Sequence, residues 1–225
     1  MRKSRQIKVG NRILGGSAPI LVQSMCNTDT ADVKATCQQI NTLAQAGCDI
    51  IRVAVPDFEA AAAIREIKKN ITIPLVADIH FDYRLAIEAA RNGADKIRIN
   101  PGNIGGDDKL REVIAVCKDR NIPIRVGVNS GSLDRELLHK YGNTPKALAE
   151  SAMKSVGLLC DRGFEDICIS IKSSDVFKTI STYRLVSEMC DFPLHLGVTE
   201  AGGAEMGTIK SAAAFGALLV DGIGD

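Results

Sequence analysis

Short apolar segments alternate with longer helical stretches along the whole chain, and this alternation constrains the fold more than any other feature. Ile and Val dominate the apolar segments, which predict strands at residues 20–25, 50–55, 75–78, 96–99, 124–128, 167–171 and 194–197. The stretches between them predict helices at residues 32–46, 58–69, 83–92, 107–120, 144–162, 176–189 and 205–219. Strands that are apolar along nearly their whole length are typical of parallel sheets buried on both faces.

The junctions between helix and strand repeat one local pattern. In AGCDIIRV, NGADKIRI and RGFEDICI a helix ends at Gly47, Gly93 or Gly163, an acidic residue follows, and a strand begins. Glycine supplies the left-handed conformation that ends a helix. The strand starts lie roughly 20 to 45 residues apart, which suits right-handed βαβ units.

Two architectures fit this pattern, an open doubly wound sheet and a (β/α)8 barrel. The first strand is not followed by GxGxxG, which argues against a dinucleotide-binding sheet, and polar residues end most strands, which favours a TIM-type barrel. The segment QIKVGNRILGGSAPI predicts a short β-hairpin at the barrel bottom. We count seven βα units where a barrel has eight, and therefore expect an α/β barrel truncated after its seventh unit.

Composition excludes several classes of function. The chain of 225 residues has 28 Lys and Arg against 27 Asp and Glu, an even balance that argues against nucleic acid as a partner. No apolar run approaches the roughly 20 residues that span a bilayer, so we expect no membrane partner and a cytoplasmic protein. The seven cysteines form no CxxC pair, and we interpret them as buried thiols in a reducing compartment rather than metal ligands.

Charged side chains fall on one face of the predicted strands. Alternate residues of a barrel strand face the interior, and the following polar residues share that face: Arg52; Asp78 and His80; Arg98 and Asn100; Arg125 and Asn129; Ser170 and Lys172. Burying so many cations costs several kcal/mol per ion unless counter-charges are present. Asp78 and Glu200 offset only part of the charge, which predicts an anionic ligand such as a phosphate or diphosphate.

An alternative is that these cations pair internally with Asp78, Asp95 and Glu200. The glycine-rich loops 100–106 and 199–207 favour the anion site, because backbone N–H groups can approach a ligand there. The three histidines have no metal-ligand spacing. We place His139 on a surface helix, His195 in the barrel interior and His80 near the barrel mouth.

Eight segments, taken in order, resemble one enzyme family. VQSM, IIRVAVP, PLVADIHFDYRLA, KIRINPGNIG, IPIRVGVNSGSL, SIKSSDVF, PLHLGVTEAGG and GIGD are similar to the 4-hydroxy-3-methylbut-2-enyl diphosphate synthases. The resemblance implies a barrel like that of dihydropteroate synthase, which binds 2-C-methyl-D-erythritol 2,4-cyclodiphosphate. It also implies reductive ring opening and loss of water, with electrons from flavodoxin or ferredoxin reaching the substrate through a 4Fe-4S cluster.

The same resemblance implies roles for individual residues. Substrate binding is expected from Arg52, Asp78, Arg98, Asn100, Arg125, Asn129, Lys172 and Thr199, and a catalytic role in proton transfer from Glu200. Residues 1–225 then form the substrate-binding domain of a head-to-tail homodimer. No metal ligand is expected in this chain, because the family carries its cluster on a separate C-terminal domain, and the barrel alone should be inactive. The alternative from a different class is a phosphate- or pterin-binding transferase of the dihydropteroate synthase type, without redox chemistry.

Overall fold

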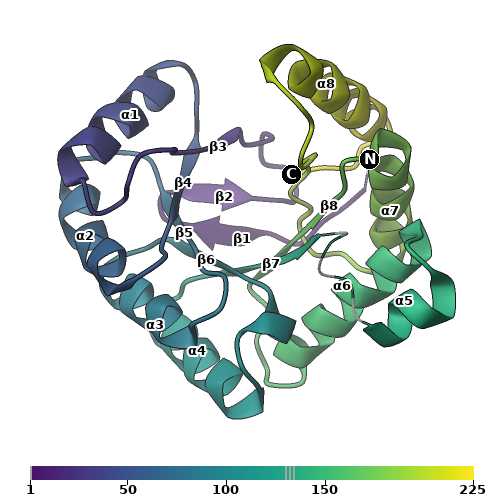
Figure 1. Ribbon diagram of the computed structural model, residues 1–225, viewed down its shortest axis with the longest axis horizontal. Coiled ribbons are helices and arrows are strands. Elements are labelled where there is room, and N and C mark those ends of the chain that lie inside the picture. Colours follow the sequence, from purple (N-terminus) through teal and green to yellow (C-terminus); the bar gives the residue numbers. More distant parts are fainter. Residues whose placement is uncertain (1, 130, 132, 134) are drawn as a thin grey trace.

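Six parallel strands form one curled sheet in the computed structural model, which describes residues 2–129, 131, 133 and 135–225 (Figure 1). Each strand pairs with its neighbour in sequence, as in a TIM-type barrel. The strands are β3 (Gln23–Met25), β4 (Ile50–Ala54), β5 (Leu75–Asp78), β6 (Lys96–Ile99), β7 (Ile124–Asn129) and β8 (Ile167–Lys172). The prediction of a parallel barrel-type α/β fold is confirmed.

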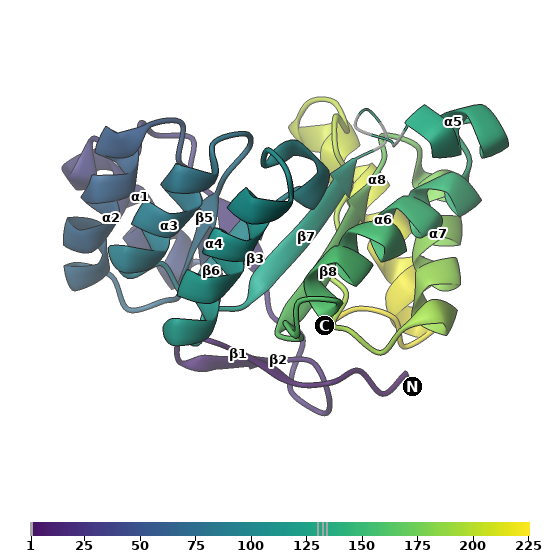
Figure 2. The same ribbon diagram turned by 90° about the horizontal axis from the view of Figure 1, so that it is seen from below.

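Helices cover the outer face of this sheet (Figures 1 and 2). They are α1 (Val33–Gln45), α2 (Phe58–Lys69), α3 (Tyr83–Arg91), α4 (Asp107–Asp119), α5 (Arg135–Tyr141), α6 (Pro145–Cys160), α7 (Val176–Met189) and α8 (Ala204–Val220). A short 3-10 helix, η1 (Pro101–Asn103), follows β6. Side chains such as Asp57 and Thr144 cap the helix starts by accepting from backbone N–H groups. Among the described α-helices, α5 lies outside the predicted helix ranges, and it contains His139, which was expected on a surface helix.

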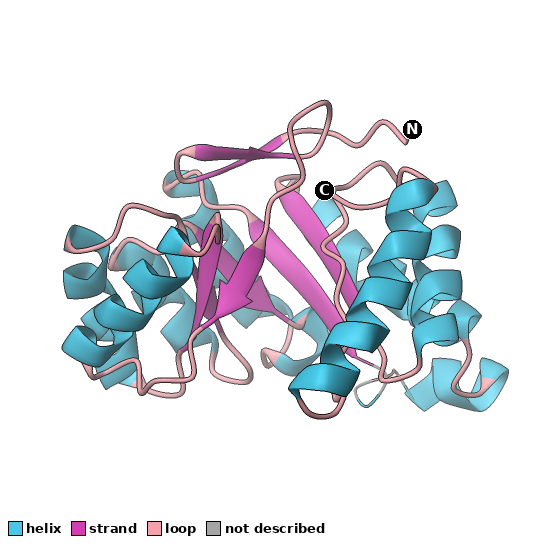
Figure 3. Cartoon of the chain, turned by 90° about the horizontal axis from the view of Figure 1, so that it is seen from above, coloured by secondary structure: helices cyan, strands magenta, loops and turns pink. Residues whose placement is uncertain are grey.

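The N-terminal hairpin closes the amino end of the barrel, as predicted. Strands β1 (Ile7–Val9) and β2 (Arg12–Leu14) pair antiparallel around Gly10, whose φ is +56°. The hairpin lies across the amino end of the sheet (Figures 2 and 3). Its buried side chains pack on residues from the amino ends of β4, β5 and β8. These contacts join Ile7, Val9 and Leu14 to Ile50, Val76 and Cys168. The carboxyl end of the barrel is therefore the open end.

Three predicted strands are shorter than expected. The first begins at Gln23 rather than at residue 20. The second ends at Ala54 rather than at residue 55. The predicted strand 194–197 is wrong in extent, because the structure has only a single parallel bridge there, between Ile169 and Leu194.

A tyrosine from α7 explains why this last strand stops. His195 N donates to Ile169 O at 2.8 Å, and a regular ladder would continue from Ile171 N to His195 O. The hydroxyl of Tyr183 stands between those two groups instead. It accepts from Ile171 N at 3.0 Å and donates to His195 O at 2.5 Å. The inserted hydroxyl satisfies both backbone groups and separates the chain after Leu194 from β8.

None of the helices that the structure describes is long and apolar enough to cross a membrane.

Candidate functional site

A small polar cavity of about 110 Å³ lies among the carboxyl ends of the strands. It is lined by Arg52, Asp78, His80, Arg98, Arg125, Asn129, Ser170, Lys172 and Thr199. Seven of these side chains were predicted to bind substrate, and they come from β4 to β8 and from the segment after Leu194. The register places Asp78 beside Arg98, Arg98 beside Arg125, and Asn129 beside Lys172. The alternation of strand residues therefore brings the predicted residues together as expected.

Asp78 is the carboxylate at the centre of the cavity. Its side chain is only 4% exposed, and it pairs with Arg98 Nη1 at 3.1 Å and Arg52 Nε at 3.7 Å. His80 Nε2 lies 3.5 Å from the same carboxylate. The guanidinium of Arg52 also contacts the sulfur of Met25 at 2.7 Å. The lining thus contains four cationic side chains and one carboxylate, a formal excess of three positive charges. The cations are Arg52, Arg98, Arg125 and Lys172.

Among the residues that the structure describes, Arg125 has no carboxylate as an ion-pair partner, and it is fully buried. It is 0% exposed, and its Nη1 lies 3.0 Å from His195 Nε2. Its Nε and Nη2 have no hydrogen-bond acceptor within the described part of the chain. Burial, followed by the charge of Arg52, lowers the pKa of Arg125 to about 10, so it stays protonated at neutral pH. A buried guanidinium with two unpaired nitrogens favours an acceptor supplied from outside the protein.

Lys172 faces the same cavity from the end of β8. Burial lowers its pKa to about 7, with further contributions from Arg52 and Arg125. A Cβ atom on Gly197 would lie 2.6 Å from Lys172 Cε, so the glycine leaves the space that the lysine occupies. Gly127 does the same for Arg98, whose Nη2 would lie 2.9 Å from an added Cβ. These two glycines are therefore part of how the cavity is built.

Asn100 and Glu200 were predicted at the site but do not line this cavity. The chain turns into η1 directly after β6, and Asn100 Oδ1 caps that turn by accepting from Gly102 N at 3.2 Å. Glu200 is exposed and has a left-handed backbone, with φ of +50°. Both residues lie in the glycine-rich loops at the open end, and their functional roles stay predictions.

Two lining residues were outside the predicted set. Ser170 shares the interior face of β8 with Lys172, a signal that alternation along the strand already contains. His80 follows β5 and is exposed at the mouth, where its ring packs edge-on against Phe81 at 6.1 Å between centroids. His195 contacts Arg125 without lining the cavity, and its neighbours along the chain carry no signal for that contact.

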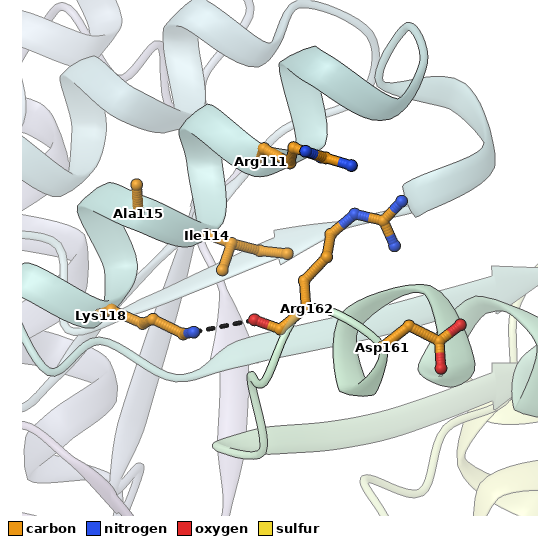
Figure 4. Close-up of a pocket in the computed structure, with 6 residues that line it drawn as sticks. All are labelled: Arg111, Ile114, Ala115, Lys118, Asp161 and Arg162. Atoms are coloured by element: carbon orange, nitrogen blue, oxygen red, sulfur yellow. Dashed lines mark hydrogen bonds between the residues drawn. The ribbon is translucent and has the colours of Figure 1, made fainter.

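A second hollow, of about 420 Å³, lies on the outer helix layer between α4 and the end of α6 (Figure 4). Its cations are engaged by the protein, since Lys118 Nζ donates to Arg162 O at 2.8 Å and Arg162 pairs with Asp107. It contains none of the predicted site residues. We therefore place the candidate site at the inner cavity.

The cysteines do not converge on a metal centre in the part of the chain that the structure describes. All seven are free thiols, and five of them are buried. Across residues 2–129, 131, 133 and 135–225, no group of three or more His, Cys, Asp or Glu side chains is placed to hold a metal ion. The described residues therefore do not fit an iron-sulfur cluster.

Comparisons with known proteins agree with this architecture. The family described as the GcpE TIM-barrel domain matches residues 4–225. The 4-hydroxy-3-methylbut-2-en-1-yl diphosphate synthase (flavodoxin) of Caldanaerobacter subterraneus subsp. tengcongensis is 63% identical over 100% of this chain and 64% of its own length. The protein of the same name from Ruminiclostridium cellulolyticum is 58% identical over 99% of this chain and 64% of its own length. The chain thus spans about 64% of the length of these two relatives.

A solved structure shows the same fold at low identity. The 7,8-dihydropteroate synthase from Vibrio fischeri superposes with a TM-score of 0.57 at 15% identity, covering 85% of this chain and 77% of that one. This likeness concerns the fold alone. The match over residues 4–225 and the close relatives decide the identity, and the chain belongs to the GcpE TIM-barrel domain family.

Proposed function

We propose that this chain is the substrate-binding barrel of a 4-hydroxy-3-methylbut-2-enyl diphosphate synthase. The substrate is 2-C-methyl-D-erythritol 2,4-cyclodiphosphate, and the product of reductive ring opening and dehydration is (E)-4-hydroxy-3-methylbut-2-enyl diphosphate, an isoprenoid precursor. The names of the relatives support the activity. The observation that carries the proposal is the cavity itself, whose formal excess of three positive charges and unpaired Arg125 nitrogens suit a diphosphate.

The cavity residues divide the work of binding. We name as the diphosphate cradle the four cations Arg52, Arg98, Arg125 and Lys172. Guanidinium groups bind phosphate oxygens in a bidentate fashion, while the lysine acts as a point charge. Asp78 orients two of the arginines through its ion pairs, and Asn129 and Thr199 add hydrogen bonds.

The glycine-rich loops complete the proposed site. Asn100 lies in one loop and Glu200 in the other, outside the cavity lining. We propose that both residues contact the substrate, and that Glu200 transfers a proton to the departing hydroxyl. Positive φ values at Gly105, Gly106 and Gly202 give these loops turns that other residues adopt with strain.

We propose that electron transfer does not depend on the cavity residues described above. The family resemblance implies a 4Fe-4S cluster that supplies electrons one at a time, on a separate C-terminal domain of a head-to-tail homodimer in the cytoplasm. The names of the relatives favour flavodoxin as the donor, with ferredoxin as the other candidate. Since the described residues do not fit a cluster, residues 1–225 serve to bind and orient the diphosphate. Turnover by a cluster-free preparation would contradict this division.

Titration calorimetry with the cyclic diphosphate tests the proposed function. The full chain should bind it, and Lys172→Ala and Arg125→Ala should each weaken binding by about 10- to 100-fold, since a hydrogen bond to a charged group contributes about 1.5–3 kcal/mol. Lys118→Ala is the matched control, because it removes a cation of the outer hollow and should leave binding unchanged. Absence of binding to the unmodified chain, or equal binding by all variants, would overturn the proposal.

The dihydropteroate synthase reading is supported by fold likeness alone, at 15% identity. The same calorimeter can be loaded with a pterin, which should not bind.

A further inference from the structure

We propose that Tyr183 and His195 are positioning residues for the diphosphate cradle. The imidazole of His195 fixes the orientation of the Arg125 guanidinium. The hydroxyl of Tyr183 holds the chain after Leu194 away from β8, which leaves room for the Lys172 side chain. Neither side chain lines the cavity, so both act through the two cations that do. The inference rests on the proposed function, because it takes Arg125 and Lys172 as ligands of the diphosphate.

The contact between Arg125 and His195 has only one possible direction. Arg125 Nη1 lies 3.0 Å from His195 Nε2, and a guanidinium can donate hydrogen bonds but cannot accept them. His195 Nε2 must therefore be the acceptor, which leaves the single ring proton on Nδ1. Within the described chain this is the partner that orients a guanidinium whose Nε and Nη2 are unpaired. Because the guanidinium is planar, fixing Nη1 also holds Nε and Nη2 of Arg125 in one orientation.

The surroundings keep His195 able to accept. Burial holds the pKa of His195 well below its ordinary value, and the charges of Arg125, Lys96, Lys172 and Arg52 act in the same direction. These four cations lie on β4, β6, β7 and β8. The imidazole therefore stays neutral at physiological pH, and the hydrogen bond to Arg125 is maintained.

Tyr183 controls the other side of the same segment. Its side chain is fully buried, and its hydroxyl stands in the ladder between Ile171 N and His195 O. A direct N–H···O bond would bring these two backbone groups to about 2.9 Å. The hydroxyl replaces that bond with two hydrogen bonds of 3.0 and 2.5 Å, which widens the gap between β8 and the segment. Two residues further on, Gly197 lies against the Lys172 side chain, since a Cβ atom added to the glycine would lie 2.6 Å from Lys172 Cε.

A matched pair of substitutions at His195 separates positioning from packing. Gln can place an acceptor where Nε2 lies, whereas Leu fills similar volume without one. His195→Leu should weaken binding of inorganic diphosphate and of the cyclic diphosphate about tenfold, and His195→Gln should stay within about threefold of the unmodified chain. In turnover assays of the full-length enzyme loaded with its cluster, the same Leu substitution should raise KM more than it lowers kcat. Equal binding by the Leu and Gln variants would overturn the role of His195, whatever their thermal stabilities.

A double-mutant cycle tests Tyr183. Tyr183→Phe removes only the hydroxyl, and it should weaken diphosphate binding severalfold in the unmodified background. In a Lys172→Ala background the same change should have little further effect, because the residue through which Tyr183 acts is gone. Losses that simply multiply in the double variant would show that Tyr183 acts elsewhere and would overturn its role.

A spectroscopic measurement keeps the inference separate from the proposed function. The ¹⁵N chemical shift of His195 Nε2 should report an unprotonated, hydrogen-bonded nitrogen from pH 5 to pH 8, and Arg125→Met should move it. This readout needs no ligand. If the unmodified chain failed to bind diphosphate but showed this shift, the function would be wrong and the contact would stand. A His195 that titrates near its ordinary pKa would refute the contact itself.

Discussion

Two lysines on the inner face of the sheet, Lys96 and Lys172, are buried in different surroundings. Lys96 is 1% exposed and lies below the cavity, where the charges of Arg125 and Arg52 act on it. Lys172 lines the cavity and can meet a ligand. Burial lowers the pKa of Lys96 to about 8 and that of Lys172 to about 7. Lys172 is therefore half protonated near neutral pH in the empty site, and an anion would raise its pKa again.

Diphosphate binding should consequently take up a proton at Lys172. The lysine pKa is about 7 before binding and higher after it, so above pH 7 the bound state holds more protons than the free state. Affinity should fall by up to about tenfold per pH unit above pH 7, and below pH 7 this dependence should disappear. Calorimetry at pH 8 in buffers of different ionisation enthalpy measures the uptake directly. Lys172→Arg, which keeps a permanent charge, should abolish it, and equal uptake by that variant would exclude Lys172 as the group.

Periodicity within one element was readable from the sequence, whereas contacts between elements were not. The alternation of Arg98 with Ile97 and Ile99 depends only on strand geometry, so it predicted the inner face correctly. The hairpin could be predicted because its Gly-Asn turn is also a local signal. The early end of the strand after Leu194 depends on where α7 places the Tyr183 hydroxyl, and no local pattern encodes that. The loop residue Glu200 likewise takes its place from backbone turns that carry no period.

Substitutions on β2 test whether the hairpin stabilises the amino end of the barrel. Leu14 and Ile13 are neighbours on β2, but Leu14 is 4% exposed and packs under the barrel, while Ile13 is 44% exposed. Leu14→Ala should lower the free energy of unfolding by about 2–4 kcal/mol, through lost burial and a residual cavity. Ile13→Ala should cost less than about 1 kcal/mol. Urea titrations followed by circular dichroism compare them, and equal losses would show that the hairpin does not seal the barrel.

At the scale of the whole molecule, a nearly neutral chain concentrates positive charge at its centre. The net charge is +1, yet Arg52, Arg98, Arg125, Lys172 and Lys96 all point into the interior, where Asp78 is the carboxylate of the cavity. Such an arrangement lowers the stability of the empty barrel, because buried charges lose their hydration. It is consistent with a fold that keeps a binding site at the expense of stability.

The effect of burying Lys96 on the free energy of unfolding can be measured through its pH dependence. Its pKa is about 8 when folded and 10.5 when unfolded, so between these values the unfolded state binds more protons and stability rises with pH. Below pH 8 both states are charged and the burial cost is fully present. The shift corresponds to about 3 kcal/mol. Lys96→Met should therefore be more stable than the unmodified chain at pH 7, and its advantage should shrink by about that amount by pH 10.5. Denaturant titrations across this pH range measure the difference in the free energy of unfolding between the two chains. A difference that stays constant with pH would mean that the pKa of Lys96 is not lowered in the folded state.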